Sequence, residues 1–186
     1  MPQITLIGMP GGGKSTVARH LARRLGLDFI DTDTLIEQRI GGSIKAFFEQ
    51  AGESRFRQIE SEVLAELVDD TGGVIATGGG IVLAEANRAL LTQHTTCIYL
   101  RSTPDELFRR LRHDSKRPLL QVADPLARLR EMHAVRDPLY RQTAHFVIDT
   151  GRPSVPTLVN MILMQLELAG VVDPAHVPSP VDSPPG

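Results

Sequence analysis

The stretch Gly8-Met9-Pro10-Gly11-Gly12-Gly13-Lys14-Ser15 matches the phosphate-binding pattern G-x-x-x-x-G-K-[ST]. It follows a short apolar run, Ile4 to Ile7, and precedes an amphipathic stretch that runs from Lys14 to a terminating Gly26. Glycines in such a loop let backbone N–H groups curl around phosphate oxygens, and the following helix adds the positive end of its dipole. The lysine neutralises β- and γ-phosphate charge, and the serine hydroxyl ligates Mg²⁺. The sequence therefore predicts a nucleoside triphosphate site here rather than a glycine turn with an exposed lysine.

The rest of the chain alternates short apolar runs with helix-length amphipathic stretches, which is the pattern of βαβ units around a parallel sheet. Further helices are predicted to begin at Arg55, at Pro104 and at Pro156. The predicted strands are Ile4–Ile7, Leu27–Ile30, Val74–Thr77, Thr96–Leu100 and Phe146–Asp149. We therefore expect a three-layer α/β/α fold with a five-stranded parallel sheet.

The composition fits one soluble domain. The 186 residues are 41% hydrophobic and 23% charged, which excludes disorder throughout and leaves little room for a second domain. We predict a single domain over residues 1–172 and a proline-rich, disordered tail over residues 173–186. The single cysteine, Cys97, excludes a disulfide framework and indicates a reducing cytoplasm. No apolar run approaches the ~20 residues of a membrane helix.

Basic residues are unevenly distributed along the chain. Of the 20 basic residues 17 are arginine, and the segment from Arg101 to Arg141 carries a net charge of +4 although the whole chain carries -2. Arginine suits bidentate capture of phosphate or carboxylate, so we expect a small anionic ligand near this segment, with solvated helix faces as the alternative. Nucleic acid is not expected as a partner, because the basic excess is local and lacks an aromatic stacking platform.

Two further clusters follow predicted strands, where open α/β sheets bind ligands. Asp31 and Asp33 come directly after the second strand, and on an extended segment they would point the same way. One could hold Mg²⁺ and the other accept a hydrogen bond from a substrate hydroxyl; a helix cap is the alternative and would use one of them at most. Gly78-Gly79-Gly80 follows Thr77 and either lets the backbone approach a ligand or forms a structural turn.

Two arginines stand out by context. Arg57 lies one residue off an apolar helical stripe, and Glu60 follows three residues later on the same face, so a weak surface ion pair is the default expectation. Arg117 lies in the polar stretch from His113 to Asp124, which we interpret as a mobile loop. An arginine there could close over the γ-phosphate and stabilise charge during transfer, with a solvated side chain as the alternative.

Taken together, these segments resemble the shikimate kinase family, which has the P-loop kinase fold. The resemblance spans about Ile4 to Thr150 and rests on an ordered set of motifs: the P-loop, Asp31-Thr32-Asp33, Gly52-Glu53, Phe56-Arg57 with Glu60, Ala76 to Gly80, Asn87-Arg88, Arg117 to Leu120, Arg136, and Leu139-Tyr140. A P-loop alone is shared by many families, whereas this ordered set is specific. The resemblance implies transfer of the γ-phosphoryl group of MgATP to the 3-hydroxyl of shikimate, in aromatic amino-acid biosynthesis. We also expect the protein to be a cytoplasmic monomer.

The resemblance also implies a role for individual residues. Asp33 would contact the substrate hydroxyls and accept or orient the reacting proton, with Lys14 and Arg117 completing the catalytic set. The implied substrate contacts are Asp33, Arg57, Gly78, Gly79, Gly80 and Arg136. The implied ATP contacts are Gly11, Gly12, Gly13, Lys14, Ser15, Thr16, Arg110, Arg117 and Arg152, and the implied Mg²⁺ contacts are Ser15 and Asp31.

Two other functions share part of this pattern. A kinase for gluconate would have the same P-loop and fold. The resemblance argues against it, because it implies that Arg57, Arg136 and the triple glycine bind a carboxylate on a rigid ring. A regulatory protein that had lost turnover would keep the fold and bind ligand without producing ADP. The joint presence of the P-loop lysine, both aspartates and the three arginines argues against it.

Overall fold

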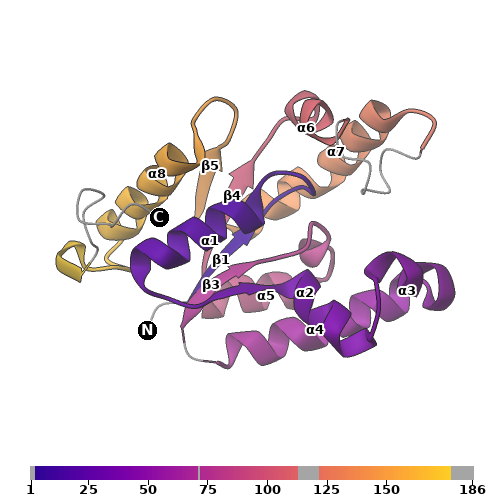
Figure 1. Cartoon of the computed structure of the whole chain (residues 1–186), viewed down its shortest axis with the longest axis horizontal. Coiled ribbons are helices and arrows are strands. Elements are labelled where there is room, and N and C mark those ends of the chain that lie inside the picture. The colour runs from indigo at the N-terminus through magenta and orange to yellow at the C-terminus, as the bar shows by residue number, and fades with distance from the viewer. Residues whose placement is uncertain (1–2, 71, 113–121, 177–186) are drawn as a thin grey trace.

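The computed structural model describes residues 3–70, 72–112 and 122–176. Within these residues five parallel strands form one sheet in the order β2-β3-β1-β4-β5 (Figure 1). The strands are β1 (Gln3–Ile7), β2 (Phe29–Asp31), β3 (Gly73–Ala76), β4 (Thr96–Arg101) and β5 (Phe146–Asp149). The predicted five-stranded parallel sheet is confirmed, and strand bounds differ from the predicted ones by no more than two residues.

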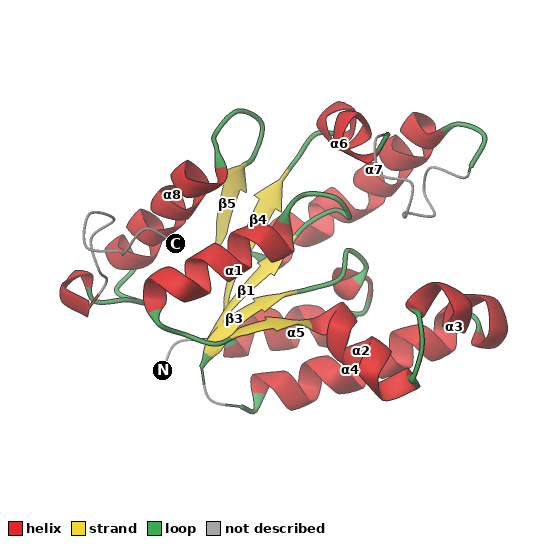
Figure 2. Cartoon of the chain, in the orientation of Figure 1, coloured by secondary structure: helices red, strands yellow, loops and turns green. Residues whose placement is uncertain are grey.

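Helices cover both faces of the sheet (Figure 2). The helices on one face are α1 (Lys14–Leu25) and α8 (Val155–Leu168), and those on the other are α4 (Glu53–Val68), α5 (Glu85–His94) and α7 (Pro125–Thr143). Successive side chains of a strand point to opposite faces. Ile4 and Leu6 accordingly pack with α1 and α8, whereas Ile7 packs in a second cluster with residues of α5 and α7. The three-layer α/β/α architecture is therefore confirmed.

The ends of two helices follow their sequence signals. α1 begins directly after Gly13 and ends at Gly26, whose positive φ of 66° lets its N–H cap the last carbonyls. α6 (Pro104–Leu111) begins after Thr103, which forms a reciprocal capping box with Glu106. Both helix starts agree with the prediction. They place the P-loop and the β4–α6 turn at the same end of the sheet (Figure 1).

Other helices go beyond those predicted from the sequence. They are α2 (Thr32–Ile40), α3 (Ile44–Ala51), α5 and α7, together with the 3₁₀ turn η1 (Ile81–Leu83). The extended arrangement predicted for Asp31 and Asp33 is wrong, because Asp31 caps α2 and Asp33 lies in its first turn. α7 contains Pro138, a residue that normally signals a helix end because it lacks the N–H donor, and this obscures the helical pattern.

The predicted loop and tail fall largely outside the described residues. Residues 113–121, which include Arg117, and residues 177–186 are not described. Residues Pro174–His176 form a short 3₁₀ helix, η3, and the proposed division of the chain at residue 172 stays a prediction. In the described part of the chain, every helix is too short or too polar to cross a membrane.

Candidate active site

The P-loop, the start of α2 and the triple glycine meet at the carboxyl edge of the sheet. β1, β3 and β2 are neighbours and end at Ile7, Ala76 and Asp31. The turn after β3 is tied to β1 and to the start of α2: Thr77 Oγ1 donates to the Leu6 carbonyl at 2.9 Å, and the Gly78 N–H donates to Thr32 Oγ1 at 3.1 Å. The two glycine clusters therefore share one edge, where open α/β sheets bind ligands.

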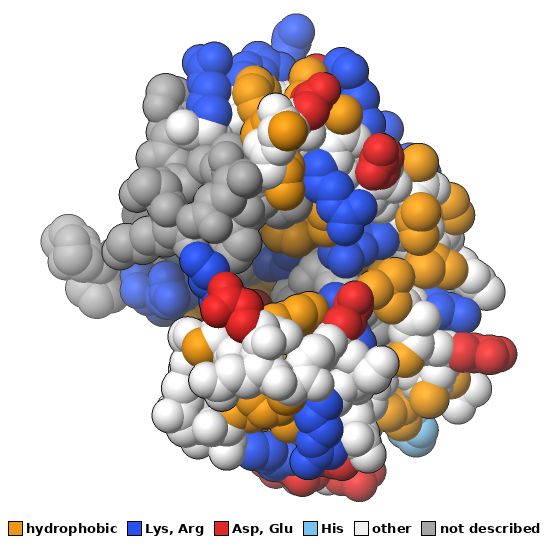
Figure 3. Space-filling view, turned by 90° about the vertical axis from the view of Figure 1, so that its right-hand side faces the viewer, with side chains coloured by type: hydrophobic (Ala, Val, Ile, Leu, Met, Phe, Trp, Pro, Cys, Tyr) orange, Lys and Arg blue, Asp and Glu red, His pale blue; other side chains and the backbone are white. Residues whose placement is uncertain are grey.

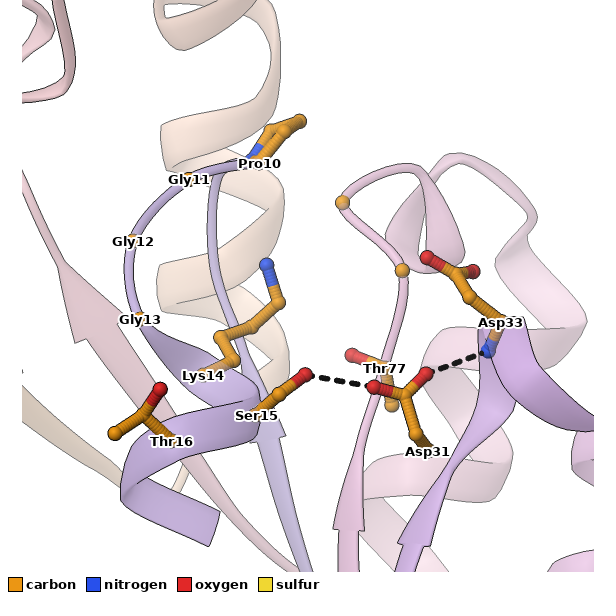
Figure 4. A pocket seen from close by; sticks show the side chains of 12 residues that line it. Pro10, Gly11, Gly12, Gly13, Lys14, Ser15, Thr16, Asp31, Asp33 and Thr77 are labelled. Atoms are coloured by element: carbon orange, nitrogen blue, oxygen red, sulfur yellow. Dashed lines mark hydrogen bonds between the residues drawn. The ribbon is translucent and has the colours of Figure 1, made fainter. Parts of the chain in front are cut away.

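The P-loop curves around the ammonium group of Lys14 (Figure 4). Lys14 Nζ donates to the carbonyls of Gly8 at 2.7 Å and Met9 at 2.9 Å, and the side chain is buried. Gly11 has a φ of 81°, and a Cβ there would lie 2.8 Å from Leu111, so glycine is needed on both counts. A positive charge is thus fixed inside a backbone loop at the N-terminus of α1, which is an arrangement suited to phosphate.

Ser15 and Asp31 place a hydroxyl and a carboxylate side by side next to the loop (Figure 4). Ser15 Oγ donates to Asp31 Oδ2 at 2.6 Å, while Asp31 Oδ1 accepts the N–H groups of Asp33 at 2.9 Å and Thr34 at 3.3 Å. Asp31 therefore caps α2 through one carboxylate oxygen and faces Ser15 of the P-loop through the other, so the predicted cap is confirmed and the role in holding Mg²⁺ stays a prediction. Adjacent hydroxyl and carboxylate oxygens are ligands of the kind that Mg²⁺ prefers.

Asp33 lies where two pockets join. Its carboxylate lines the P-loop pocket and also a second pocket on the other side of the glycine turn. Burial raises the pKa of Asp33, the neighbouring charge of Asp31 raises it further, and the charges of Lys14 and Arg57 oppose the shift. A carboxylate with a raised pKa in a cleft has the properties of a general base.

The second pocket carries two arginines from separate elements. Arg57 enters from α4 and Arg136 from α7, and the rest of the lining comprises Pro10, Asp33, Ile44, Phe48, Phe56, Glu60, Gly78, Gly79, Gly80 and Met132. Figure 3 views the molecule from this end, where Lys and Arg side chains border a hollow. All the described residues predicted to contact substrate are thus brought together. The apolar lining residues carry no chemical signal that sequence reasoning could have used.

Arg57 and Glu60 do not form the surface ion pair expected by default. Arg57 Nη1 lies 2.9 Å from Glu60 Oε1, and the Glu60 side chain is only 2% exposed. Burial raises the pKa of Glu60 although the charge of Arg57 opposes the shift. The sequence does contain a signal for this burial, because Glu60 is four residues from both Phe56 and Leu64 and so lies on the apolar stripe of α4.

The three glycines after Thr77 sit where side chains do not fit. A Cβ on Gly79 would lie 2.7 Å from Pro10 Cδ, one on Gly78 would lie 2.9 Å from Asp33 Oδ1, and one on Gly80 would overlap the Arg57 guanidinium. The absence of side chains therefore brings the P-loop and the two pocket residues close to a single turn. These contacts are with protein atoms, so packing alone accounts for the glycines, and the approach of their backbone to a ligand stays a prediction.

The remaining predicted ATP residues occupy other places. Arg110 and Arg152 line one shallow hollow, and Arg110 Nη2 donates to the Thr150 carbonyl at 3.3 Å. Ser102 Oγ accepts a hydrogen bond from Arg110 at 3.5 Å and lies 3.7 Å from the position of a Cβ on Gly12, so this hollow adjoins the P-loop. Thr16 is exposed in the first turn of α1. Arg117 lies outside the described residues.

Together, the fold and the site define a P-loop kinase whose acceptor is a small anion. The family model described as "Shikimate kinase" matches residues 10–167, and the shikimate kinase of Paracidovorax citrulli is 56% identical over 179 residues, covering 94% of this chain and 98% of that protein. The chain belongs to the shikimate kinase family, and its reaction is the ATP-dependent phosphorylation of the 3-hydroxyl of shikimate.

Two further comparisons agree with this. The shikimate kinase of Ralstonia nicotianae is 53% identical over 177 residues, covering 95% of this chain and 93% of the relative. The solved structure of shikimate kinase from Acinetobacter baumannii in complex with shikimate has a TM-score of 0.86 and 42% identity, covering 93% of this chain and 96% of that one. The P-loop kinase fold expected from the resemblance is therefore confirmed.

Proposed function

We propose that the enzyme transfers the γ-phosphoryl group directly to shikimate at the junction of the two pockets, with Asp33 beside the reacting hydroxyl. The observation that carries this proposal is that the P-loop pocket and the arginine pocket share Asp33, Pro10, Gly78 and Gly79. A triphosphate on the P-loop and an anion at the arginines would both face this junction. Phosphoryl transfer leaves little covalent work to the protein, so positioning is its main contribution.

In this proposal the side chains divide the work between the acceptor and the phosphates. Arg57 and Arg136 bind the substrate carboxylate, and the glycine turn contributes close backbone contacts. Asp33 accepts a hydrogen bond from the 3-hydroxyl and takes its proton as that oxygen bonds to the γ-phosphorus and ADP leaves. Lys14 neutralises charge on the β- and γ-phosphates.

The nucleotide contacts extend outward from the lysine. The P-loop residues Gly11, Gly12, Gly13, Ser15 and Thr16 are assigned to the phosphates, and Arg110 and Arg152 to the region of the adenine. Arg117 is assigned to the phosphates as the third catalytic side chain, and this assignment rests on the family resemblance alone.

We propose that Ser15 and Asp31 hold Mg²⁺, the serine directly and the aspartate through water. Within the described residues, no three His, Cys, Asp or Glu side chains cluster as a metal site, so further ligands would come from water and phosphate. The bound ion would neutralise phosphate charge. Excess EDTA should abolish shikimate-dependent ADP production, and Mg²⁺ added above the EDTA concentration should restore it. Full turnover in EDTA would contradict this assignment.

The substrate is tested by a coupled assay for ADP. With MgATP, the enzyme is expected to produce ADP when shikimate is added but not when gluconate is added at the same concentration. In this proposal the two arginines are placed to bind a carboxylate on a rigid ring, and the flexible chain of gluconate does not match that arrangement. Phosphorylation of gluconate alone would overturn the assignment. Binding of shikimate without ADP formation would indicate a regulatory protein instead.

The enzyme's setting belongs to the same proposal: a cytoplasmic monomer with neither nucleic acid nor membrane as a partner. The one cysteine, Cys97, is buried, and burial raises the pKa of its thiol to about 12. Such a chain needs no oxidising compartment to fold, which supports a reducing one.

A further inference from the structure

The two tyrosines of the chain form a buried pair behind the glycine turn. Tyr99 lies in β4 and Tyr140 in α7, both are fully buried, and their ring centroids lie 4.8 Å apart. Their hydroxyls have different partners. The Tyr140 hydroxyl donates to the Gly79 carbonyl at 2.5 Å, whereas the Tyr99 hydroxyl donates to Asp137 Oδ1 at 2.7 Å. Two neighbouring rings of the same type, tilted by 34° to each other, thus send one hydroxyl to a residue of the arginine pocket and the other to a residue outside that pocket.

Tyr140 contacts both walls of the arginine pocket. Arg136 lies four residues before Tyr140, on the same face of α7, so the two side chains are neighbours on the helix, and the charge of Arg136 opposes the rise that burial causes in the pKa of Tyr140. Gly79 belongs to the glycine turn, which forms the other wall. The Tyr140 hydroxyl therefore ties the part of α7 that carries Arg136 to the glycine turn of the arginine pocket.

We propose that Tyr140 is a positioning residue for shikimate, because its hydroxyl holds Arg136 and the Gly79 carbonyl in the arrangement that receives the substrate carboxylate. The inference rests on the proposed function, which assigns Arg136 to that carboxylate. A free arginine side chain samples many rotamers, and holding it in place before binding lowers the entropy lost when the ligand arrives. Tyr140 does not line the P-loop pocket, and although its partner Gly79 lines both pockets, Lys14 is held by the Gly8 and Met9 carbonyls, so ATP affinity should change little.

The test compares Tyr140→Phe with Tyr99→Phe. The first keeps the ring and removes the hydroxyl that donates to the Gly79 carbonyl, and it should raise both KM and Kd for shikimate about three- to tenfold, the effect of one lost hydrogen bond. The values of kcat and of KM for ATP should stay within about twofold. Tyr99→Phe removes a hydrogen bond from the same buried pair and should leave shikimate KM unchanged. An equal rise in both variants, or no rise in Tyr140→Phe, would overturn the proposal.

Arg136→Ala separates this inference from the function on which it rests. If Tyr140 acts through Arg136, Tyr140→Phe should weaken shikimate binding much less in the Arg136→Ala background than in the wild type. Unchanged shikimate binding in Arg136→Ala would contradict the proposed function itself. Weakened binding in Arg136→Ala with additive loss in the double variant would contradict only the role of Tyr140.

A spectroscopic measurement does not depend on the stability of Tyr140→Phe. The chain has no tryptophan, so the fluorescence of Tyr99→Phe reports Tyr140 alone. Shikimate should change this signal, because the guanidinium beside the Tyr140 hydroxyl is drawn to the carboxylate, and ADP alone should not. An unchanged signal at saturating shikimate would contradict the coupling.

Discussion

Asp33→Asn is expected to lower kcat by about 10²- to 10⁴-fold, the range typical of a lost general base. The carboxylate lies at the junction of the two pockets, and burial together with Asp31 raises its pKa, so it can take a proton from a bound hydroxyl. The amide keeps the shape of the side chain but cannot accept the proton. Affinity for ATP should change less than about threefold, because Lys14 and the P-loop backbone are untouched. Single-turnover and steady-state ADP assays measure the two effects separately.

Glu37→Gln is the matched control for this variant. Glu37 lies one turn later on α2, is exposed and is outside both pockets. Its charge contributes to the raised pKa of Asp33 less than burial and Asp31 do, so its loss should leave kcat within about twofold. Near-normal turnover in Asp33→Asn would remove Asp33 from the catalytic role. A comparable loss in both variants would point to α2 as a structural element rather than to one carboxylate.

Asp33→Asn is expected to lower activity but not to lower the stability of the folded protein. The folded state raises the pKa of Asp33 above its ordinary value of 3.8, so the folded protein binds this proton more tightly than the unfolded chain. The ionised carboxylate therefore costs stability at neutral pH, and the cost vanishes as the pH falls below 3.8. Ligand-free Asp33→Asn should thus have a Tm at pH 7 equal to or above that of the wild type. A lower Tm would show that other interactions of the carboxylate outweigh its burial.

The sheet could be predicted from the sequence because each strand is a short apolar run between clear breakers. Helix starts were equally accessible where a capping signal is local, as at Gly13-Lys14 and Thr103-Pro104. α2 and α7 could not be predicted from the sequence in this way. In α2 the cap, Asp31, also ends a strand, and in α7 Pro138 breaks the local pattern although the fold tolerates it.

The candidate site was predictable to the extent that its residues carry charge or lack side chains. Whether such a residue is buried or exposed was harder to predict. The default for Glu60 was a solvated ion pair because i, i+3 spacing alone does not reveal what covers a helix face. Its burial involves the glycine turn, where Glu60 Oε2 lies 3.3 Å from the position of a Cβ on Gly78, and this is a contact between segments far apart in sequence. For the same reason, the hydrogen bond between Tyr140 and Gly79 has no signature in the sequence.

Arg57→Ala is expected to raise KM for shikimate by about 10²- to 10³-fold, because it removes a charge-assisted contact to the substrate carboxylate in a partly buried site. KM for ATP should change less than about threefold, since Arg57 lies outside the P-loop pocket. Arg55→Ala is the control. Arg55 is exposed on the same helix, two residues away and outside the arginine pocket, so its loss should leave both constants unchanged. A normal KM for shikimate in Arg57→Ala would remove this arginine from the substrate site.

The loss of Arg57 also removes the hydrogen-bonded partner of the buried Glu60 carboxylate, so this variant is expected to lose stability as well as affinity for shikimate. Removing one partner of a buried hydrogen-bonded pair costs about 1–3 kcal/mol. Without Arg57 the pKa of Glu60, already above its ordinary 4.5, should rise further, so stability should fall as the pH increases through this raised value. The deficit in free energy of unfolding relative to wild type should thus be larger at pH 8 than at pH 5.

Arg57→Ala combined with Glu60→Gln should recover most of the stability at pH 8 while KM for shikimate stays high. The neutral amide at position 60 no longer needs the arginine, whereas the substrate carboxylate still does. Urea unfolding at the two pH values tests this, and a deficit independent of pH would mean that Glu60 is not the group left unpaired.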